Sequence, residues 1–198
     1  AKEIDAELVH VSTDYVFDGT SSRPYLETDT PCPQSVYGSS KLAGEKNVME
    51  SMEKYYIVRT AWLYGDGKNF VRTMLRLAKD HDMLTVVNDQ FGSPTSALEL
   101  ARMILYIIGK KDYGIYHATC EGITSWYDFA REIFKQASVS IQVKPVSTEE
   151  YPAAIAKSPA YSVLENAHLH ALGDYRMKDW KDALKEYMAG NEPIKASE

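Results

Sequence analysis

The sequence has little of what membrane-spanning, secreted or nucleic-acid-binding proteins need. No apolar stretch approaches the ~20 residues that cross a bilayer, and no signal peptide opens the chain. The formal net charge is −6 and no basic run is present, which argues against a nucleic-acid groove because phosphate binding needs a basic face. Cys32 and Cys120 lie far apart, so neither a disulfide framework nor a zinc site is suggested. We expect a cytoplasmic protein that handles a small molecule, without metal, nucleic acid or membrane.

The chain also lacks the glycine-rich turn that cradles a dinucleotide pyrophosphate between a first strand and its helix. The nearest approach, Gly65-Asp66-Gly67, reaches Phe70 where that fingerprint needs a glycine. The chain opens on Ala1 rather than methionine, and the pattern of a strand begins within a dozen residues. We therefore expect these residues to be the back part of a longer polypeptide.

What is present is an alternation of strand and helix patterns. Helical patterns cover about 35–53 and 69–79, follow Ser96 and Ser125, and surround Trp180. Short apolar runs predict strands over residues 7–13, 55–60, 84–87, 114–118 and 141–146. This alternation indicates one α/β unit with a largely parallel sheet.

The start of the helix after Ser96 also shows a specific local pattern. Ser96-Ala97-Leu98-Glu99 has the form of a capping box, in which the serine caps the helix and the glutamate reaches back to it.

The stretch with the clearest chemical meaning is Tyr37-Gly38-Ser39-Ser40-Lys41, at the start of the first long predicted helix. Residues four apart lie one above the other on a helix face, so a phenol and an ammonium are neighbours here. A cation about 4 Å away, at an effective dielectric of ~20, favours phenolate by at most ~4 kcal/mol. Such a tyrosine can deliver a proton to an oxygen that is becoming an alkoxide. On its own, however, this spacing also fits an ordinary amphipathic helix.

Three polar clusters follow predicted strands, at residues 12–15, 59–62 and 88–92. In a parallel α/β sheet, ligands bind outside the carboxyl ends of the strands, and the Tyr37 helix begins soon after the first cluster. Thr13, Tyr37 and Lys41 could therefore converge on one carbonyl oxygen, to polarise a ketone and protonate it as hydride arrives.

Five motifs resemble, in the same order, those of the extended short-chain dehydrogenase/reductases, and within them the dTDP-4-dehydrorhamnose reductases. They cover most of the chain and read STDYVFDG (12–19), PQSVYGSSKLAGE (33–45), RTAWLYG (59–65), NDQFGSPT (88–95) and PAYSVL (159–164). The resemblance implies the C-terminal part of a Rossmann-type doubly wound parallel sheet plus a small substrate-binding lobe. Residues 1–198 would form a single unit, with the lobe contributed mainly by about 62–100 and 119–198.

The same resemblance implies a reaction and roles for individual residues. The reaction is reduction of the C4 ketone of dTDP-4-dehydro-β-L-rhamnose to dTDP-β-L-rhamnose by NADPH or NADH, in polysaccharide biosynthesis. Thr13 would hydrogen-bond the C4 carbonyl and Tyr37 would be the general acid. Lys41 would lower the pKa of Tyr37 and bind the nicotinamide ribose. The residues implied to bind the cofactor are Tyr37, Lys41 and Thr60. The residues implied to bind the sugar nucleotide are Asp14, Tyr15, Trp62, Gln90 and Thr95.

Several of these residues also have a purely structural interpretation. Trp62 could be a core residue at a strand end, and Gln90 and Thr95 could be loop and cap residues. Arg59 could form a structural salt bridge rather than touch phosphate. His168 and His170 would not align as a metal pair on either a strand or a helix.

Two other functions remain open at this stage. One is a sugar-nucleotide epimerase or dehydratase, although dehydratases usually carry an acidic pair where Thr13 is followed by a single Asp14 and Tyr15. The other is a non-catalytic regulatory subunit of the same fold. Most of the cofactor site would lie in the missing N-terminal segment, so we expect the 198 residues alone to bind NADPH poorly and to turn over little. A homodimer is a candidate assembly.

Overall fold

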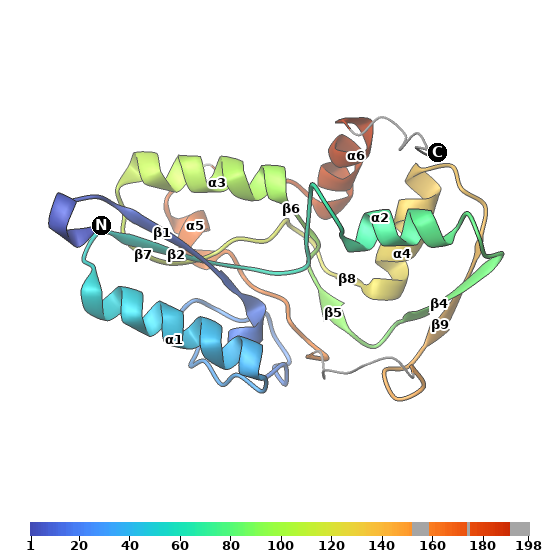
Figure 1. The fold of residues 1–198 in the computed structure, drawn as a ribbon, viewed down its shortest axis with the longest axis horizontal. Helices are drawn as coiled ribbons and strands as arrows, with labels where there is room; N and C mark the ends of the chain where they lie inside the picture. The colour runs from blue at the N-terminus through green and yellow to red at the C-terminus, as the bar shows by residue number, and fades with distance from the viewer. Residues whose placement is uncertain (152–158, 174, 191–198) are drawn as a thin grey trace.

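The computed structural model describes residues 1–151, 159–173 and 175–190. At its centre is a three-stranded parallel sheet in the order β1-β2-β7 (Figure 1), in which Thr13 lies opposite Thr60 and Arg59 opposite His117. The strands are β1 (Leu8–Thr13), β2 (Tyr55–Thr60) and β7 (Gly114–His117). Because all three run in one direction, their carboxyl ends meet at one edge.

Helices cover both faces of this sheet. Figure 1 shows α1 (Val36–Ser51) on one side and α3 (Ala97–Lys110) on the other, with α5 (Ala167–Ala171) packed on β7. The short 3-10 helices are η1 (Lys2–Ile4), before β1, and η2 (Asp14–Val16), directly after it. The sequence-based expectation of an α/β protein with a parallel sheet is confirmed.

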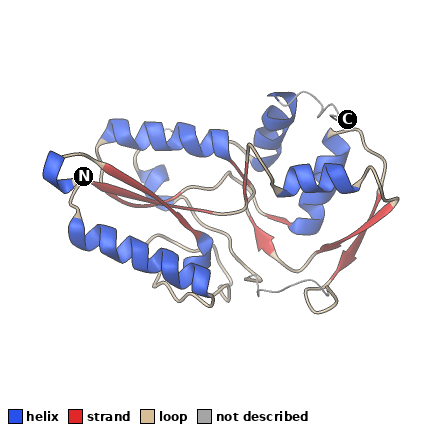
Figure 2. Ribbon diagram, in the orientation of Figure 1, coloured by secondary structure: helices blue, strands red, loops and turns tan. Residues whose placement is uncertain are grey.

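The remaining elements gather at the other end of the molecule (Figure 2), where α4 packs against α2 and α6. They are α2 (Phe70–Leu77), β4 (Met83–Val87), α4 (Trp126–Gln136), β9 (Gln142–Val146) and α6 (Trp180–Gly190). β4 and β9 pair in parallel, away from the central sheet. Two other strand pairings are short and join the two ends. They are β3 (Leu63–Tyr64) with β6 (Thr95–Ser96), and β5 (Phe91–Gly92) with β8 (Thr124–Ser125), and isolated bridges add to them. That this end forms the substrate lobe stays a prediction.

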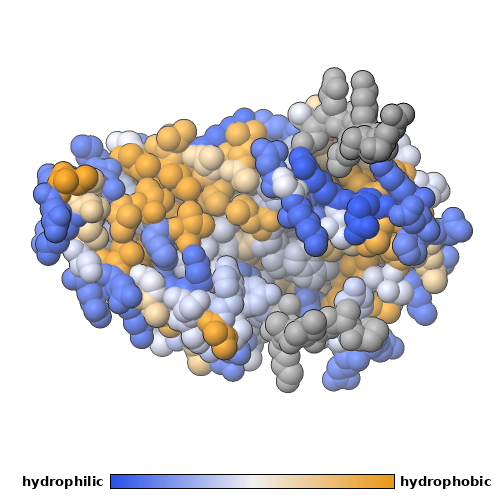
Figure 3. All heavy atoms as spheres, in the orientation of Figure 1, coloured by the Kyte–Doolittle hydropathy of each residue, from blue (hydrophilic) through white to orange (hydrophobic). Residues whose placement is uncertain are grey.

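One hydrophobic core runs through both ends. Val58 and Tyr116 of the sheet, Met103 of α3 and Phe129 of α4 are fully buried in it. The apolar side chains on view in Figure 3 gather over the region of α3, where Leu105 remains 72% exposed.

One local prediction was wrong. Ser96 is the N-cap residue of α3, but its side chain makes no capping hydrogen bond. The Glu99 carboxylate does not reach back to it; it accepts hydrogen bonds from Arg102 at 2.5 Å and from the backbone of Lys178 at 3.3 Å. Arg102 on the same helix and the distant Lys178 thus take the carboxylate that a capping box would use. The predicted cap at Ser125 is confirmed, since its hydroxyl accepts from the Asp128 amide at 3.0 Å.

Every helix in the described ranges is too short or too polar to cross a membrane. Those ranges also contain no group of three or more His, Cys, Asp or Glu side chains placed to hold a metal ion. His168 bonds Asp112 and His170 bonds Glu121 instead.

Candidate active site

The carboxyl end of β1 turns directly into η2, and this junction carries the first candidate residues. Thr13 is the N-cap of η2, and its Oγ1 accepts a hydrogen bond from the Tyr15 amide at 3.2 Å. The same hydroxyl donates to Asp14 Oδ1 at 2.9 Å. Thr13 and Asp14 are both buried, so this pair is fixed at the end of the strand.

The start of α1 brings Tyr37 and Lys41 to the same place. Ser35 caps the helix by accepting from the Gly38 amide at 3.1 Å. Tyr37, in the first turn, lies edge-on to the Tyr15 ring at 5.7 Å between centroids and remains 54% exposed. One turn later, Lys41 Nζ donates to the backbone oxygen of Val11 at 2.6 Å.

The predicted catalytic residues therefore gather around the end of β1. Tyr37 contacts Tyr15, two positions after Thr13. Lys41 donates a hydrogen bond to the backbone oxygen of Val11, two positions before Thr13. No hydrogen bond joins the Thr13 hydroxyl directly to Tyr37 or Lys41 in the described residues. Catalytic hydrogen bonds often tighten only when substrate is bound, so this spacing suits a group that enters between them.

Gly38 explains how α1 can lie so close to η2. A Cβ atom at this position would stand 2.1 Å from the backbone oxygen of Tyr15 and 3.0 Å from Pro33 Cβ. Only glycine permits that approach, and the approach sets where the neighbouring Tyr37 ring lies.

A buried ionic network, which the sequence analysis did not find, holds α1 to the sheet. Glu45 Oε2 accepts from Arg59 Nη2 at 2.7 Å, and Glu45 Oε1 accepts from Ser12 Oγ at 2.5 Å. The Glu45 and Arg59 side chains are 0% and 2% exposed. Of the two interpretations of Arg59, the structural salt bridge is therefore the one observed. Glu45 follows Tyr37 and Lys41 at the same four-residue spacing, and this spacing was the signal in the sequence that could have placed Glu45 on the same helix face.

The environment of Asp14 is the least usual in the site. Burial raises the pKa of its carboxyl from 3.8 to about 6, although hydrogen bonds from Thr13, Ser162 and the Tyr15 backbone lower it. Oδ2 has no hydrogen-bond partner among the described residues. A carboxyl group in this state changes its charge near neutral pH.

Thr60 ends β2 directly beside Thr13 and is only 6% exposed. Its Oγ1 has no hydrogen-bond partner in the described part of the chain. A buried hydroxyl without a partner is uncommon and marks a place where a ligand atom can complete the bonding.

The predicted substrate residues of the other end are held in different ways. Trp62 has a left-handed φ of 47° and stacks on Trp126 at 3.6 Å between ring centroids. Gly92 makes room for it, because a Cβ there would lie 2.5 Å from the Trp62 ring. Gln90 Nε2 donates to Thr148 Oγ1 at 3.0 Å. Their contacts with substrate stay predictions, and the stacking partner Trp126 was not anticipated from the sequence.

Thr95 is fully buried, and its hydroxyl already has two partners. Oγ1 donates to the Ser93 backbone oxygen at 3.1 Å and accepts from the Cys120 amide at 3.3 Å. Its predicted role in substrate binding would need one of these bonds to change.

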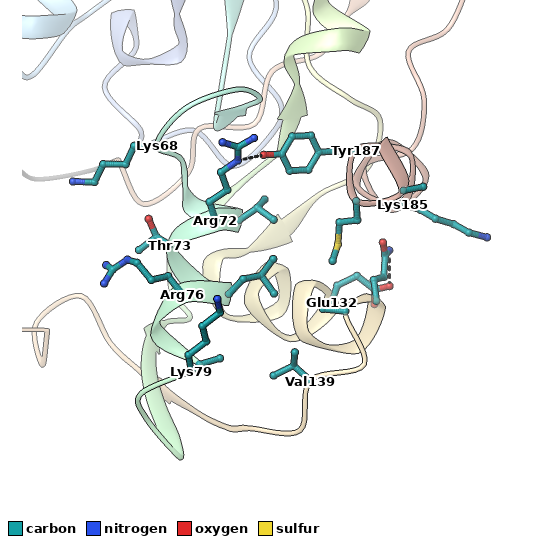
Figure 4. Close-up of a pocket in the computed structure, with 16 residues that line it drawn as sticks. Lys68, Arg72, Thr73, Arg76, Lys79, Glu132, Val139, Lys185 and Tyr187 are labelled. Carbon is teal, nitrogen blue, oxygen red and sulfur yellow. Dashed lines mark hydrogen bonds between the residues drawn. The ribbon is translucent and has the colours of Figure 1, made fainter. Parts of the chain in front are cut away.

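A cavity of about 1290 Å³ lies between α2, α4 and α6, apart from all of these residues (Figure 4). Cationic side chains surround it, among them Lys68, Arg72, Arg76 and Lys79, and Arg72 Nε donates to the Tyr187 hydroxyl at 3.0 Å. None of the predicted catalytic or substrate residues lines it.

Comparison with known proteins decides the family. Residues 1–192 match the family model described as the RmlD substrate binding domain. The chain belongs to the dTDP-4-dehydrorhamnose reductase family. A curated dTDP-4-dehydrorhamnose reductase from Aggregatibacter actinomycetemcomitans is 43% identical to it, over 93% of this chain and 67% of that protein.

Solved structures of the dTDP-4-dehydrorhamnose reductase family agree with the fold. A dTDP-4-dehydrorhamnose reductase from Clostridium acetobutylicum has a TM-score of 0.92 and 54% identity, over 96% of this chain and 67% of that chain. The enzyme from Bacillus anthracis, solved in complex with NADP, has a TM-score of 0.92 and 44% identity over the same shares. The chain spans about two thirds of the length of the curated relatives that it matches: 67% of the Aggregatibacter enzyme, and 65% of the spore coat polysaccharide biosynthesis protein SpsK from Bacillus subtilis, to which it is 42% identical over 93% of this chain.

Proposed function

We propose that this chain carries the catalytic and substrate-binding residues of a reductase that converts dTDP-4-dehydro-β-L-rhamnose to dTDP-β-L-rhamnose. The observation that carries the proposal is the grouping of Thr13, Tyr37 and Lys41 around the carboxyl end of β1. Family membership and the printed activity of the relatives support the choice of substrate. Such an enzyme would work in the cytoplasm.

The roles of the three residues follow from their positions. The Thr13 hydroxyl, at the end of β1, would hydrogen-bond the C4 carbonyl oxygen and hold it beside the helix start. The exposed Tyr37 phenol would donate a proton to that oxygen as it becomes an alkoxide. Lys41, anchored on Val11, would place its positive charge close to the same oxygen and stabilise the developing negative charge.

The residues at this edge also fit the nicotinamide-ribose end of a dinucleotide. Thr60 offers a buried hydroxyl without a partner, and Tyr37 and Lys41 offer a phenol and an ammonium beside it in the fold. NADPH or NADH, when bound, supplies the hydride. The Bacillus anthracis relative, solved with NADP, favours NADPH. We still expect residues 1–198 on their own to bind it weakly, because they lack a glycine-rich pyrophosphate turn.

On the substrate side, we assign Asp14, Tyr15, Trp62, Gln90 and Thr95 to the sugar nucleotide. Trp62 and Trp126 are both half-buried, and such aromatic rings suit an apolar sugar or base face. The lobe would then comprise mainly residues 62–100 and 119–198. A homodimer would be compatible with this site.

The decisive experiment is NADPH consumption by the complete gene product with dTDP-4-dehydrorhamnose, compared with its Tyr37→Phe variant. Loss of a general acid should lower kcat by roughly 10²- to 10⁴-fold. Tyr55→Phe is the matched control, since Tyr55 lies at the opposite end of the sheet and should leave kcat unchanged.

Each result of this experiment has a definite meaning. Turnover that survives in Tyr37→Phe would remove the assigned acid. A wild-type protein that binds NADPH without reducing this ketone would point to a different sugar nucleotide or to a regulatory subunit. Running NADH in parallel decides between the two cofactors.

A further inference from the structure

The Thr13 hydroxyl has a single proton, and the structure shows where it goes. Oγ1 donates it to Asp14 Oδ1 at 2.9 Å, while accepting from the Tyr15 amide at 3.2 Å. A hydroxyl has one donor and two acceptor sites, so Thr13 in this state has only an acceptor left. The proposed reduction, however, needs Thr13 to donate to a carbonyl oxygen, which is itself only an acceptor.

The other partner of this bond is a carboxyl group in an environment that disfavours its charge. Asp14 is 3% exposed, and its Oδ2 has no hydrogen-bond partner among the described residues. The groups that face it are the hydroxyls of Thr13 and Ser162 and the Tyr15 amide, all of them uncharged. Burial therefore dominates, and raises the pKa of Asp14 to about 6.

Building on the proposed function, we propose that Asp14 is a positioning residue that sets the direction of the Thr13 hydroxyl. As a carboxylate, Asp14 holds the Thr13 proton away from the substrate. As a carboxylic acid, it donates its own proton to Thr13 Oγ1, and the Thr13 proton turns toward the C4 carbonyl oxygen.

This arrangement gives both directions of the reaction the same requirement. In reduction, the ketone accepts from Thr13, which requires protonated Asp14. Oxidation passes through the same transition state, in which the substrate hydroxyl gives its proton to Tyr37 while Thr13 donates to the C4 oxygen, so it requires protonated Asp14 as well. No proton passes permanently between Asp14 and Thr13 in either direction, so the chemistry at Tyr37 is unchanged.

The expected size of the effect follows from one hydrogen bond. Above pH 6, Thr13 can donate to the ketone only by leaving the carboxylate, which then loses a charged hydrogen bond. We expect kcat/KM for reduction to fall between pH 5.5 and 8.5 by roughly ten- to hundredfold, or about 1.4 to 2.7 kcal/mol, and then to level off.

The first test compares pH profiles of the complete gene product with those of Asp14→Asn. Asparagine keeps the shape and is neutral at every pH, and its amide can donate to Thr13 Oγ1. The fall in reduction above pH 6 should therefore disappear in Asp14→Asn. Asp80→Asn, at an exposed carboxyl in the turn after α2, should keep the wild-type profile.

One other titratable group near the site needs its own variant. Burial and Lys41 lower the pKa of His10, which lies against α1 at Gly44. His10→Asn should retain the fall above pH 6. A fall that persists in Asp14→Asn, or vanishes in His10→Asn, would overturn the proposal.

A second readout does not depend on activity. Infrared titration of the 198-residue chain should show a carboxyl group with a midpoint near pH 6 that is absent from Asp14→Asn. Because the Thr13 hydrogen bond lowers the pKa of Asp14, Thr13→Val should move this midpoint upward. An unmoved midpoint would refute the coupling even if the enzyme is active. If instead the complete protein reduces no ketone, the proposed function fails while this titration still decides the coupling.

Discussion

Replacing Glu45 with glutamine should destabilise the protein far more than a typical surface change. The carboxylate of Glu45 is fully buried and, within the described part of the chain, is the only acidic partner of Arg59, which is itself 2% exposed. Glutamine keeps the shape but leaves a buried guanidinium charge without compensation. Breaking a buried ion pair in this way costs about 3–5 kcal/mol, against a total stability of about 5–15 kcal/mol for a domain.

The measurement is urea denaturation at pH 7, with thermal unfolding alongside. For a chain of this size, each kcal/mol shifts Tm by about 2–4 °C, so Glu45→Gln should lower Tm by roughly 6–20 °C. The m-value should stay constant if only stability changes.

A double variant separates the buried charge from the loss of packing. Glu45→Leu with Arg59→Met removes both charges and keeps apolar volume, so it should recover at least half of the loss. Ser12 loses its acceptor in this variant, which limits the recovery by about 1 kcal/mol. A loss below about 1 kcal/mol in Glu45→Gln, or a double variant no more stable than the single one, would refute the reasoning.

Two further predictions concern the close packing of α1 on η2 and the stability of the fold in acid. Gly38→Ala should destabilise the fold and lower kcat, because its Cβ would overlap the Tyr15 backbone oxygen at 2.1 Å. The control Gly109→Ala, in an open part of α3, should instead stabilise the fold by up to about 1 kcal/mol in the same denaturation assay. Burial and Arg59 lower the pKa of His117 from 6.5 to about 3, so its neutral form stabilises the fold above pH 6.5 and that stability is lost as pH falls. Between pH 6.5 and 5, His117→Asn should lose about 2 kcal/mol less than the wild type, as measured by urea denaturation at each pH; equal losses would contradict the assignment.

The elements around the site were predictable because their patterns are local. The branched apolar run before Ser12 and the caps at Ser35 and Ser125 specify β1, α1 and α4 within a few residues. The rule that ligands lie at the carboxyl ends of parallel strands then placed Thr13 near the start of the Tyr37 helix. That placement needed no tertiary information beyond strand direction.

What escaped prediction depends on contacts between distant residues. Glu45 looks like a surface charge on a helix, and only the partner Arg59, 14 residues away, makes it a buried anchor. The stacking of Trp62 on Trp126 joins positions 64 residues apart, and the left-handed φ of Trp62 has no sequence signal. Glu99 shows the converse error, since a local pattern suggested a cap while Arg102 and Lys178 took the carboxylate.

Asp14 links stability and the proposed function, because both depend on its protonation state. Its folded-state pKa of about 6 lies above the ordinary value of 3.8, so the fold favours the protonated form. The stability from this group is complete below pH 3.8 and is lost as pH rises through 6, by at most about 3 kcal/mol. Asp14→Asn cannot ionise, so its free energy of unfolding relative to the wild type should increase as the pH rises from 4 to 8 in urea denaturation. Its reduction rate should at the same time lose the pH dependence derived above. A stability difference that is the same at both pH values would show that the buried carboxyl does not titrate in this range, and the gating of Thr13 would fall with it.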